Sequence, residues 1–191
     1  MTGPVIETER LHLRPLDETD CDLAIEMFTD HMVARYVGGV LSREKIIEDF
    51  PKWMRRAGGE SIGVWCILDK VNGEKLGTGV LLPMPVDVDD TEWDLLTDDE
   101  HFPDRDIEVG YILRRTAWGR GIATEVCRAL LNFAFEQTPL DVIVACTDKE
   151  NHASQHVLTK SGMRSVGAIL AYGDSDSPGF EITREEWLAN A

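Results

Sequence analysis

Residues 107–125 read IEVGYILRRTAWGRGIATE. The stretch begins with a β-like run, and from Ile122 onward apolar residues recur at helical spacing, so it predicts a strand followed by a helix. Gly119 and Gly121 stand at the junction, on either side of Arg120. Because glycine weakens strands and helices alike, this pair indicates a backbone that bends sharply or approaches something closely.

The start of the predicted helix is suited to an anion. A helix N-terminus presents unpaired amides and about half a positive charge, and residues without side chains let an anion reach those amides. The N–H groups of residues 119–123 would cradle phosphate oxygens, with Arg115 and Arg120 adding positive charge. The Gly-Lys-Ser/Thr ending of a P-loop is missing, and Thr124 stands where a dinucleotide fingerprint needs a third glycine. A plain strand-to-helix turn with tightly packed glycines is the open alternative.

Composition limits the class of protein. The 191 residues, of which 43% are hydrophobic, suffice for one domain. The formal charge of −16 opposes a nucleic-acid partner, because phosphates would be repelled. No segment reaches the roughly 18 apolar residues of a membrane span, and a signal-peptide pattern is missing, so we expect a soluble, cytoplasmic protein with no membrane partner. The cysteines form no CxxC pair, and three sit among apolar neighbours as expected free thiols: Cys66, Cys127 and Cys146.

Patterning predicts the remaining elements. Strands are expected over 10–16, 61–68, 75–82, 142–146, 163–172 and 180–182, with a hairpin turn at Asn72-Gly73. Helices are expected from an N-cap at Thr19 to about Asp30, from Ser42 to a kink or end at Pro51, from 122 to before Pro139, and from Asn151 to Gly162, with a terminal turn over 185–189. This order predicts one α/β domain over residues 1–191 with a mixed sheet.

An acidic insertion interrupts the pattern at about residues 86–106. Eleven acidic residues and one basic residue, Arg105, lie between Asp87 and Glu108. The insertion could rim an acceptor pocket and attract a cationic amine, or it could be a solvated, mobile loop with a short helical turn. Both alternatives are open.

Several motifs, in order along the chain, resemble the GNAT superfamily of N-acetyltransferases and its RimJ/RimL-type branch. The family's acetyl-CoA loop, Gln/Arg-x-x-Gly-x-Gly/Ala, is similar to residues 116–121, with Thr116 as a departure at the first position. Glu-Val-Gly-Tyr at 108–111 and Trp-Gly-Arg-Gly-Ile-Ala-Thr-Glu at 118–125 match the branch. Residues 7–16, 151–154 and 160–163 resemble its first strand and its Asn-x-x-Ser and Lys-x-Gly-Phe segments.

The resemblance implies a single-domain α/β fold with a mixed, mostly antiparallel sheet, flanked by helices, whose fourth and fifth strands splay apart. It implies acetyl-CoA as cosubstrate, without a metal, and places the pantetheine arm in the splay. Backbone N–H groups near Ile112 and Leu113 would meet that arm. The full set of expected cofactor-binding residues is Ile112, Leu113, Arg115, Trp118, Gly119, Arg120, Gly121, Ile122, Ala123, Thr124 and Asn151.

Two residues are candidates for proton transfer. Glu108 is the candidate base, acting directly or through a water, and would suit an α-amine with a pKa of about 7.7–8.0. Many GNAT enzymes use a tyrosine acid four residues after the position of Ser154, but Leu158 stands there, so the resemblance favours Ser154. A solvated strand carboxylate is the alternative for Glu108, and helix capping is the alternative for Ser154 and Asn151.

The implied partner is an amine acceptor, either a peptide N-terminus or a small amine, and the resemblance also suggests a homodimer. The rival in another class is a catalytically idle acyl-CoA-binding or regulatory domain of the same fold. A nucleotide-binding protein using the loop for ATP is a third alternative without a supporting lysine or metal-ligand set. His152 and His156 have helical spacing but lack a third ligand, so exposed helix residues are expected.

Overall fold

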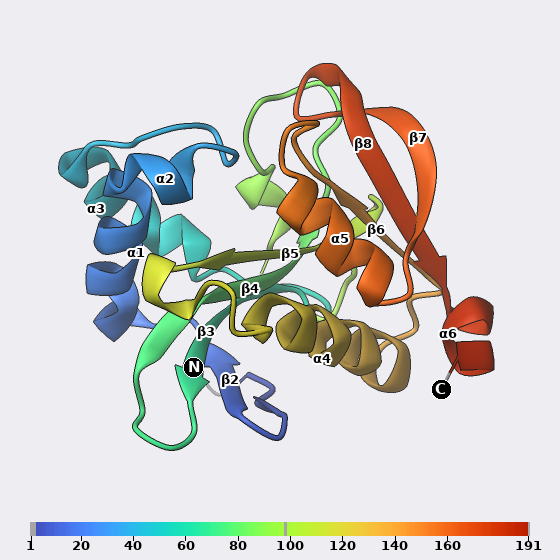
Figure 1. Ribbon diagram of the computed structural model, residues 1–191, viewed down its shortest axis with the longest axis horizontal. Helices are drawn as coiled ribbons and strands as arrows, with labels where there is room; N and C mark the ends of the chain where they lie inside the picture. Colours follow the sequence, from blue (N-terminus) through green and yellow to red (C-terminus); the bar gives the residue numbers. More distant parts are fainter. Residues whose placement is uncertain (1–2, 98, 191) are drawn as a thin grey trace.

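The computed structural model describes residues 3–97 and 99–190. Eight strands form one sheet in the order β1-β2-β3-β4-β5-β6-β8-β7, shown in Figure 1. Asp98, part of the predicted insertion, lies outside the described residues. The strands are β1 (Ile6–Glu7), β2 (Leu11–Pro15), β3 (Gly63–Asp69), β4 (Lys75–Pro83), β5 (Ile107–Leu113), β6 (Val142–Cys146), β7 (Arg164–Ala171) and β8 (Asp174–Thr183).

The sheet is mixed and mostly antiparallel, which confirms the predicted fold class. Strands β1 to β5 pair antiparallel in chain order, β6 runs parallel to β5, and β8 returns antiparallel between β6 and β7. The predicted hairpin turn joins β3 to β4, with Gly73 at φ +71°, and Asn72 Oδ1 accepts a hydrogen bond from Glu74 N–H at 2.9 Å. A left-handed conformation at this position is the reason that glycine stands there.

Helices flank this sheet on both faces (Figure 1). The stripe of Ile122, Val126, Leu130 and Ala134 is buried against the sheet, as its spacing predicted. The α-helices are α1 (Cys21–Thr29), α2 (His31–Ala34), α3 (Arg43–Trp53), α4 (Ile122–Gln137), α5 (His152–Lys160) and α6 (Arg184–Asn190). The short 3-10 helices are η1 (Glu18–Asp20), η2 (Trp93–Leu95) and η3 (Arg115–Ala117).

One predicted helix boundary was wrong, and one of the two alternatives for another is excluded. Thr19 is not an N-cap, because Asp17 caps η1 first and accepts a hydrogen bond from Thr19 N–H at 2.8 Å. Pro51 does not end α3, which continues to Trp53. The aromatic ring of Trp53, in the last turn of α3, packs on Phe28 of α1, with ring centroids 5.1 Å apart.

Patterning also missed parts of the sheet and one helix. Strand β1 has two residues and α2 has four, too few for a periodic signal. Strand β8 begins at Asp174 rather than at Phe180, because its polar first half is exposed and is held by pairing with β7. Such a segment carries no apolar alternation, so its strand is set by its partner.

Candidate active site

A gap between β5 and β6 is the centre of the candidate site. Strand β5 pairs with β4 along its whole length, from Pro83↔Ile107 to Gly77↔Leu113. With β6 it shares one register pair, Glu108↔Val144, and the two strands diverge beyond it (Figure 1). This is the predicted splay of the fourth and fifth strands, counted here as β5 and β6 because of the short β1.

The edge of β5 that faces the gap offers free peptide groups. Arg114 N–H donates to Leu76 O of β4 at 3.0 Å. Peptide groups alternate in direction along an antiparallel strand, so the groups of Ile112 face β4, and those of Leu113 and Tyr111 face the gap. Of the two N–H groups expected to meet the pantetheine arm, the Leu113 N–H points into the gap and the Ile112 N–H does not. Leu113 O is bound by the Trp118 indole N–H at 2.8 Å.

Residues 119–124, at the N-terminus of α4, form an open turn at one end of the gap that could hold an anion and is called the cradle. Gly119 and Gly121 have φ of +69° and +77°, which L-residues with side chains rarely adopt. Gly121 is the N-cap of α4, and no side chain caps this end. The N–H groups of Ile122, Ala123 and Thr124 precede the first intrahelical hydrogen bond, from Glu125 N–H to Gly121 O at 3.2 Å. A Cβ atom at Gly119 would meet no atom within 4 Å, so the cradle is accessible.

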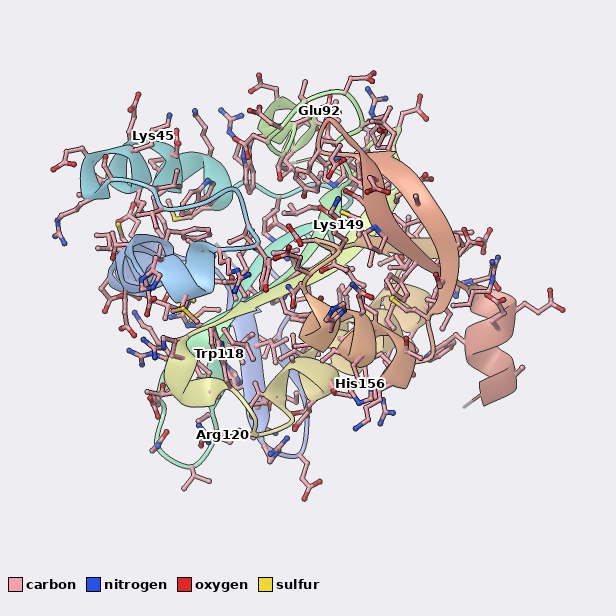
Figure 2. The ribbon with its side chains drawn as sticks, turned by 45° about the horizontal axis from the view of Figure 1, so that its top comes forward. Lys45, Glu92, Trp118, Arg120, Lys149 and His156 are labelled. Carbon is pink, nitrogen blue, oxygen red and sulfur yellow. The ribbon has the colours of Figure 1, made fainter. Side chains whose placement is uncertain are left out.

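The two arginines beside this cradle form ion pairs with carboxylates. Arg120 pairs with Asp69 at 3.3 Å and Arg115 with Asp30 at 3.8 Å. Both arginines are exposed, as is Trp118, a residue that is 43% exposed. Figure 2 shows Trp118 and Arg120 on the loop that leads into α4. Thr116, the departure from the family pattern, lies exposed in η3.

A clamp from the first strands holds the cradle in shape. Arg10 donates one hydrogen bond to Arg120 O at 2.9 Å and another to Glu125 Oε2 at 2.6 Å. Glu125 Oε1 also accepts from the Thr8 hydroxyl. Burial alone would raise the pKa of Glu125, but the hydrogen bonds from Thr8 and Arg10 outweigh it and lower the pKa. Sequence reasoning missed this clamp, since its members lie more than a hundred residues apart.

Ser154 and Asn151 lie where α5 meets the gap. Asn151 Oδ1 accepts a hydrogen bond from Ser154 N–H at 3.2 Å, so Asn151 caps α5. Ser154 Oγ lies 3.1 Å from the Tyr111 hydroxyl. Burial raises the pKa of Tyr111 well above its usual range, so this phenol stays protonated. Leu158, one turn further along α5, is buried in the core.

Glu108 is a buried carboxyl, so the alternative of a solvated strand carboxylate was wrong. Its Oε1 accepts a hydrogen bond from the Tyr172 hydroxyl, and its Oε2 lies 3.9 Å from Cys146 Sγ. Burial raises the pKa of Glu108 to about 7, against these two hydrogen bonds, which lower it. A carboxyl with such a pKa exchanges a proton near neutral pH, as a general base must.

Strand β5 separates the candidate residues between the two faces of the sheet. Tyr111 pairs with Gly79, whose face is covered by Val126 and Leu130 of α4. Tyr111 therefore points toward α4 and α5, where it meets Ser154. Glu108 lies on the opposite face, because side chains alternate along a strand. The gap thus has a buried carboxyl on one face and the N-terminus of α4 with the Tyr111–Ser154 pair on the other.

The acidic insertion is anchored to the body of the protein. It contains η2, so the predicted short helical turn is confirmed, and Leu96 is buried in the core. Phe102 packs on Gly58, whose N–H donates to His101 O at 2.9 Å. Most of its acidic side chains are exposed. In Figure 2, Glu92 marks the insertion at the opposite end of the molecule from Trp118 and the cradle.

Within the described residues, no group of three or more His, Cys, Asp or Glu side chains could hold a metal ion. His152 and His156 lie exposed on α5, and Figure 2 shows His156 at the surface. The four cysteines are free thiols, of which Cys66 and Cys127 are buried. Among the helices searched in residues 3–97 and 99–190, none is long and apolar enough to cross a membrane.

Comparison with known proteins decides the family. The family profile of the acetyltransferase (GNAT) domain matches residues 10–164, which is most of the chain. The chain belongs to the GNAT acetyltransferase family. The FsC-acetyl coenzyme A-N(2)-transacetylase of Aspergillus fumigatus is 28% identical over 194 residues, covering 97% of this chain and 78% of that protein.

Solved structures support the GNAT fold. A GNAT-family acetyltransferase from Bacillus anthracis superposes with a TM-score of 0.73 at 23% identity, covering 95% of this chain and 99% of the other. A spermidine N-acetyltransferase from Vibrio cholerae superposes with a TM-score of 0.71 at 17% identity, with the same coverage. The protein is therefore a GNAT N-acetyltransferase, an enzyme whose acetyl donor is acetyl-CoA.

Proposed function

We propose that this GNAT enzyme acetylates a primary amine by direct attack in a ternary complex, with Glu108 as base and Ser154 as acid. One observation carries the proposal: the uncapped N-terminus of α4 and the buried Glu108 carboxyl lie on opposite faces of the same gap. Two substrates can thus approach from opposite sides. The resemblance of residues 108–125 to RimJ/RimL-type enzymes favours the α-amine of a peptide as acceptor.

The residues of the cradle fit a coenzyme A phosphate. Acetyl-CoA, when bound, supplies an activated acetyl thioester. The amides of residues 119–124 would bind its phosphates, because Gly119 leaves them uncovered and α4 adds its dipole. The Leu113 N–H, which faces the gap, would orient the pantetheine arm. Trp118 supports that strand edge through its hydrogen bond to Leu113 O.

Glu108 takes a proton from the attacking amine in this proposal. Its pKa of about 7 is close to that of an α-amine, about 7.7–8.0, so the proton transfer is nearly balanced in free energy. Oε2 is the accepting atom, since Oε1 already accepts from Tyr172. On the other face, Ser154 Oγ is the proton donor, and the Tyr111 hydroxyl 3.1 Å away can orient it by a hydrogen bond.

The acceptor of this proposal carries positive charge. The structural neighbour from Vibrio cholerae is a spermidine N-acetyltransferase solved with CoA and spermine. The exposed acids of the insertion, joined to the Tyr172 turn on the Glu108 face, would raise the encounter rate of a cationic amine. The free cysteines favour a reducing, cytoplasmic location.

The test has two stages. Calorimetric titration with acetyl-CoA, coenzyme A and ATP should show binding of the two coenzyme A forms and no binding of ATP. Thiol release from acetyl-CoA is then followed with spermidine and with a short peptide carrying a free N-terminus. Binding without thiol release across a wider amine panel would support the idle acyl-CoA-binding alternative.

The substitution Glu108→Gln tests the base. It keeps the shape of the side chain and should lower kcat/KM by about 10²- to 10⁴-fold while leaving coenzyme A affinity unchanged. The matched control is Glu181→Gln, which removes a carboxyl from the paired region of β8 outside the gap. Full turnover in Glu108→Gln would exclude the proposed base.

A further inference from the structure

Glu108 has a hydrogen-bond partner from a distant part of the chain. Tyr172 lies in the turn between β7 and β8, and its hydroxyl donates to Glu108 Oε1. Burial and the neighbouring carboxyl raise the pKa of Tyr172 far above its ordinary value, so its phenol keeps the proton. Tyr172 is therefore a permanent donor to Glu108. The titratable side chains facing Glu108 in the described chain are Tyr172 from the turn and Cys146 from β6.

The backbone holds Tyr172 in a conformation that tyrosine rarely adopts. Its φ is +53°, and Glu60 is the other non-glycine residue with positive φ in the described part of the chain. Such a conformation persists where surrounding bonds over-determine it. Tyr172 N–H donates to Pro85 O at 3.1 Å, and Gly173 N–H donates to Val86 O at 2.9 Å. The start of the acidic insertion thus fixes the turn.

The insertion also reaches the Tyr172 side chain itself. The Thr91 side chain lies near the Tyr172 hydroxyl and lowers the pKa of Tyr172, against the larger effects of burial and Glu108. Below the turn, Met84, Val144 and Ala171 form a small buried cluster against which Tyr172 and Cys146 pack. Backbone hydrogen bonds and apolar packing therefore both set the position of the Tyr172 hydroxyl relative to Glu108.

We propose that Tyr172 is a positioning residue for Glu108. The Tyr172 hydroxyl binds Oε1 of Glu108 and leaves Oε2 to take the proton of the amine acceptor. This inference rests on the proposed role of Glu108 as base. Cys146 Sγ, 3.9 Å from Oε2, is a weak donor, so Oε2 remains able to accept a proton. The acidic insertion therefore acts on the reaction by fixing the turn that carries Tyr172, as well as through its charge.

The protonation of Glu108 can be measured without an acceptor. Its carboxyl titrates near pH 7, apart from ordinary carboxyls, so difference infrared spectra between wild type and Glu108→Gln isolate its C=O band. Tyr172→Phe should raise the midpoint of that band by about one to two pH units, because the carboxylate loses a donor. The acid limb of kcat/KM should move by the same amount.

Two further variants act as controls. Tyr111→Phe removes a buried hydroxyl from β5 itself, but on the opposite face, and should leave the Glu108 midpoint unchanged. Thr91→Val removes the hydroxyl that lowers the pKa of Tyr172, so Tyr172 becomes a weaker donor and the Glu108 midpoint should rise by a smaller amount. This variant keeps the test valid if Tyr172→Phe does not fold. Calorimetric binding of coenzyme A, whose cradle is on the other face, reports folding.

The outcomes separate the two proposals. An unchanged midpoint in folded Tyr172→Phe and in Thr91→Val overturns the positioning role, even where Glu108→Gln is inactive. If Tyr111→Phe shifts the Glu108 midpoint as much as Tyr172→Phe does, the positioning role is also overturned, because the shift would then not depend on the hydrogen bond from Tyr172. Full turnover in Glu108→Gln overturns the base itself. A shifted midpoint with the matching shift in kcat/KM supports both.

Discussion

A negative charge placed at Gly119 tests whether the cradle at the N-terminus of α4 binds the phosphates of coenzyme A. Gly119 has φ +69°, and a Cβ atom there meets nothing within 4 Å, so a small side chain fits without a clash. The substitution Gly119→Asp adds a carboxylate to the cradle, and Gly119→Asn adds an amide of the same shape. Both residues tolerate a left-handed backbone better than other side chains, at a similar cost in folding stability.

The expected difference between the two variants is electrostatic. For two charges about 6 Å apart and an effective dielectric constant of about 40, the repulsion is about 1.4 kcal/mol, which corresponds to about tenfold in affinity. A pyrophosphate carries more than one charge, so coenzyme A should bind Gly119→Asp about ten- to a hundredfold more weakly than Gly119→Asn. Gly119→Asn should remain within about threefold of wild type.

Isothermal titration calorimetry with coenzyme A measures this difference directly, and thermal unfolding confirms that both variants are folded. The difference in coenzyme A affinity between the Asp and Asn variants should become smaller as the salt concentration rises from about 0.05 to 0.5 M, because the cradle is exposed and salt screens the repulsion. Equal affinities for the Asp and Asn variants at low salt would refute the assignment of coenzyme A phosphates to this end of α4.

The remaining predictions concern the clamp and the acidic insertion. Glu125→Gln should lower the free energy of unfolding by about 1–2 kcal/mol at pH 7 in urea titrations. Because folding lowers the pKa of Glu125 below its ordinary 4.5, this difference should be fully present above pH 4.5 and decline as the pH falls through the folded-state pKa; a difference that does not change with pH on the acid side would contradict the role of its charge. Replacing three exposed insertion acids by Asn should raise KM for spermidine several-fold at low salt, whereas neutralising three exposed acids elsewhere should not; equal effects would count against local attraction. The insertion set is Asp87, Asp89 and Asp90, and the control set is Glu9, Glu18 and Glu136.

Local sequence patterns predicted most of the helices and strands. The runs at 107–113 and 122–137 gave a strand and a helix with the predicted starts, because their apolar residues repeat with the period of each element. Asn151 and Gly162 bound α5 as an N-cap and a residue at φ +95°, as their chemistry predicted. Elements without a periodic signal of their own, such as β1, α2 and the polar half of β8, were set by their neighbours in the sheet and core.

Local sequence motifs and periodicity were enough to predict the GNAT family, the order of the longer elements and the glycine turn before α4, since each signal is carried by residues close together in the chain. The environment of Glu108, by contrast, arises only in the folded chain. Its burial, its pKa of about 7 and its hydrogen bond from Tyr172 arise from β6, a turn 64 residues away and the acidic insertion that fixes that turn. Such an environment depends on desolvation and on distances between remote segments, which no local pattern encodes.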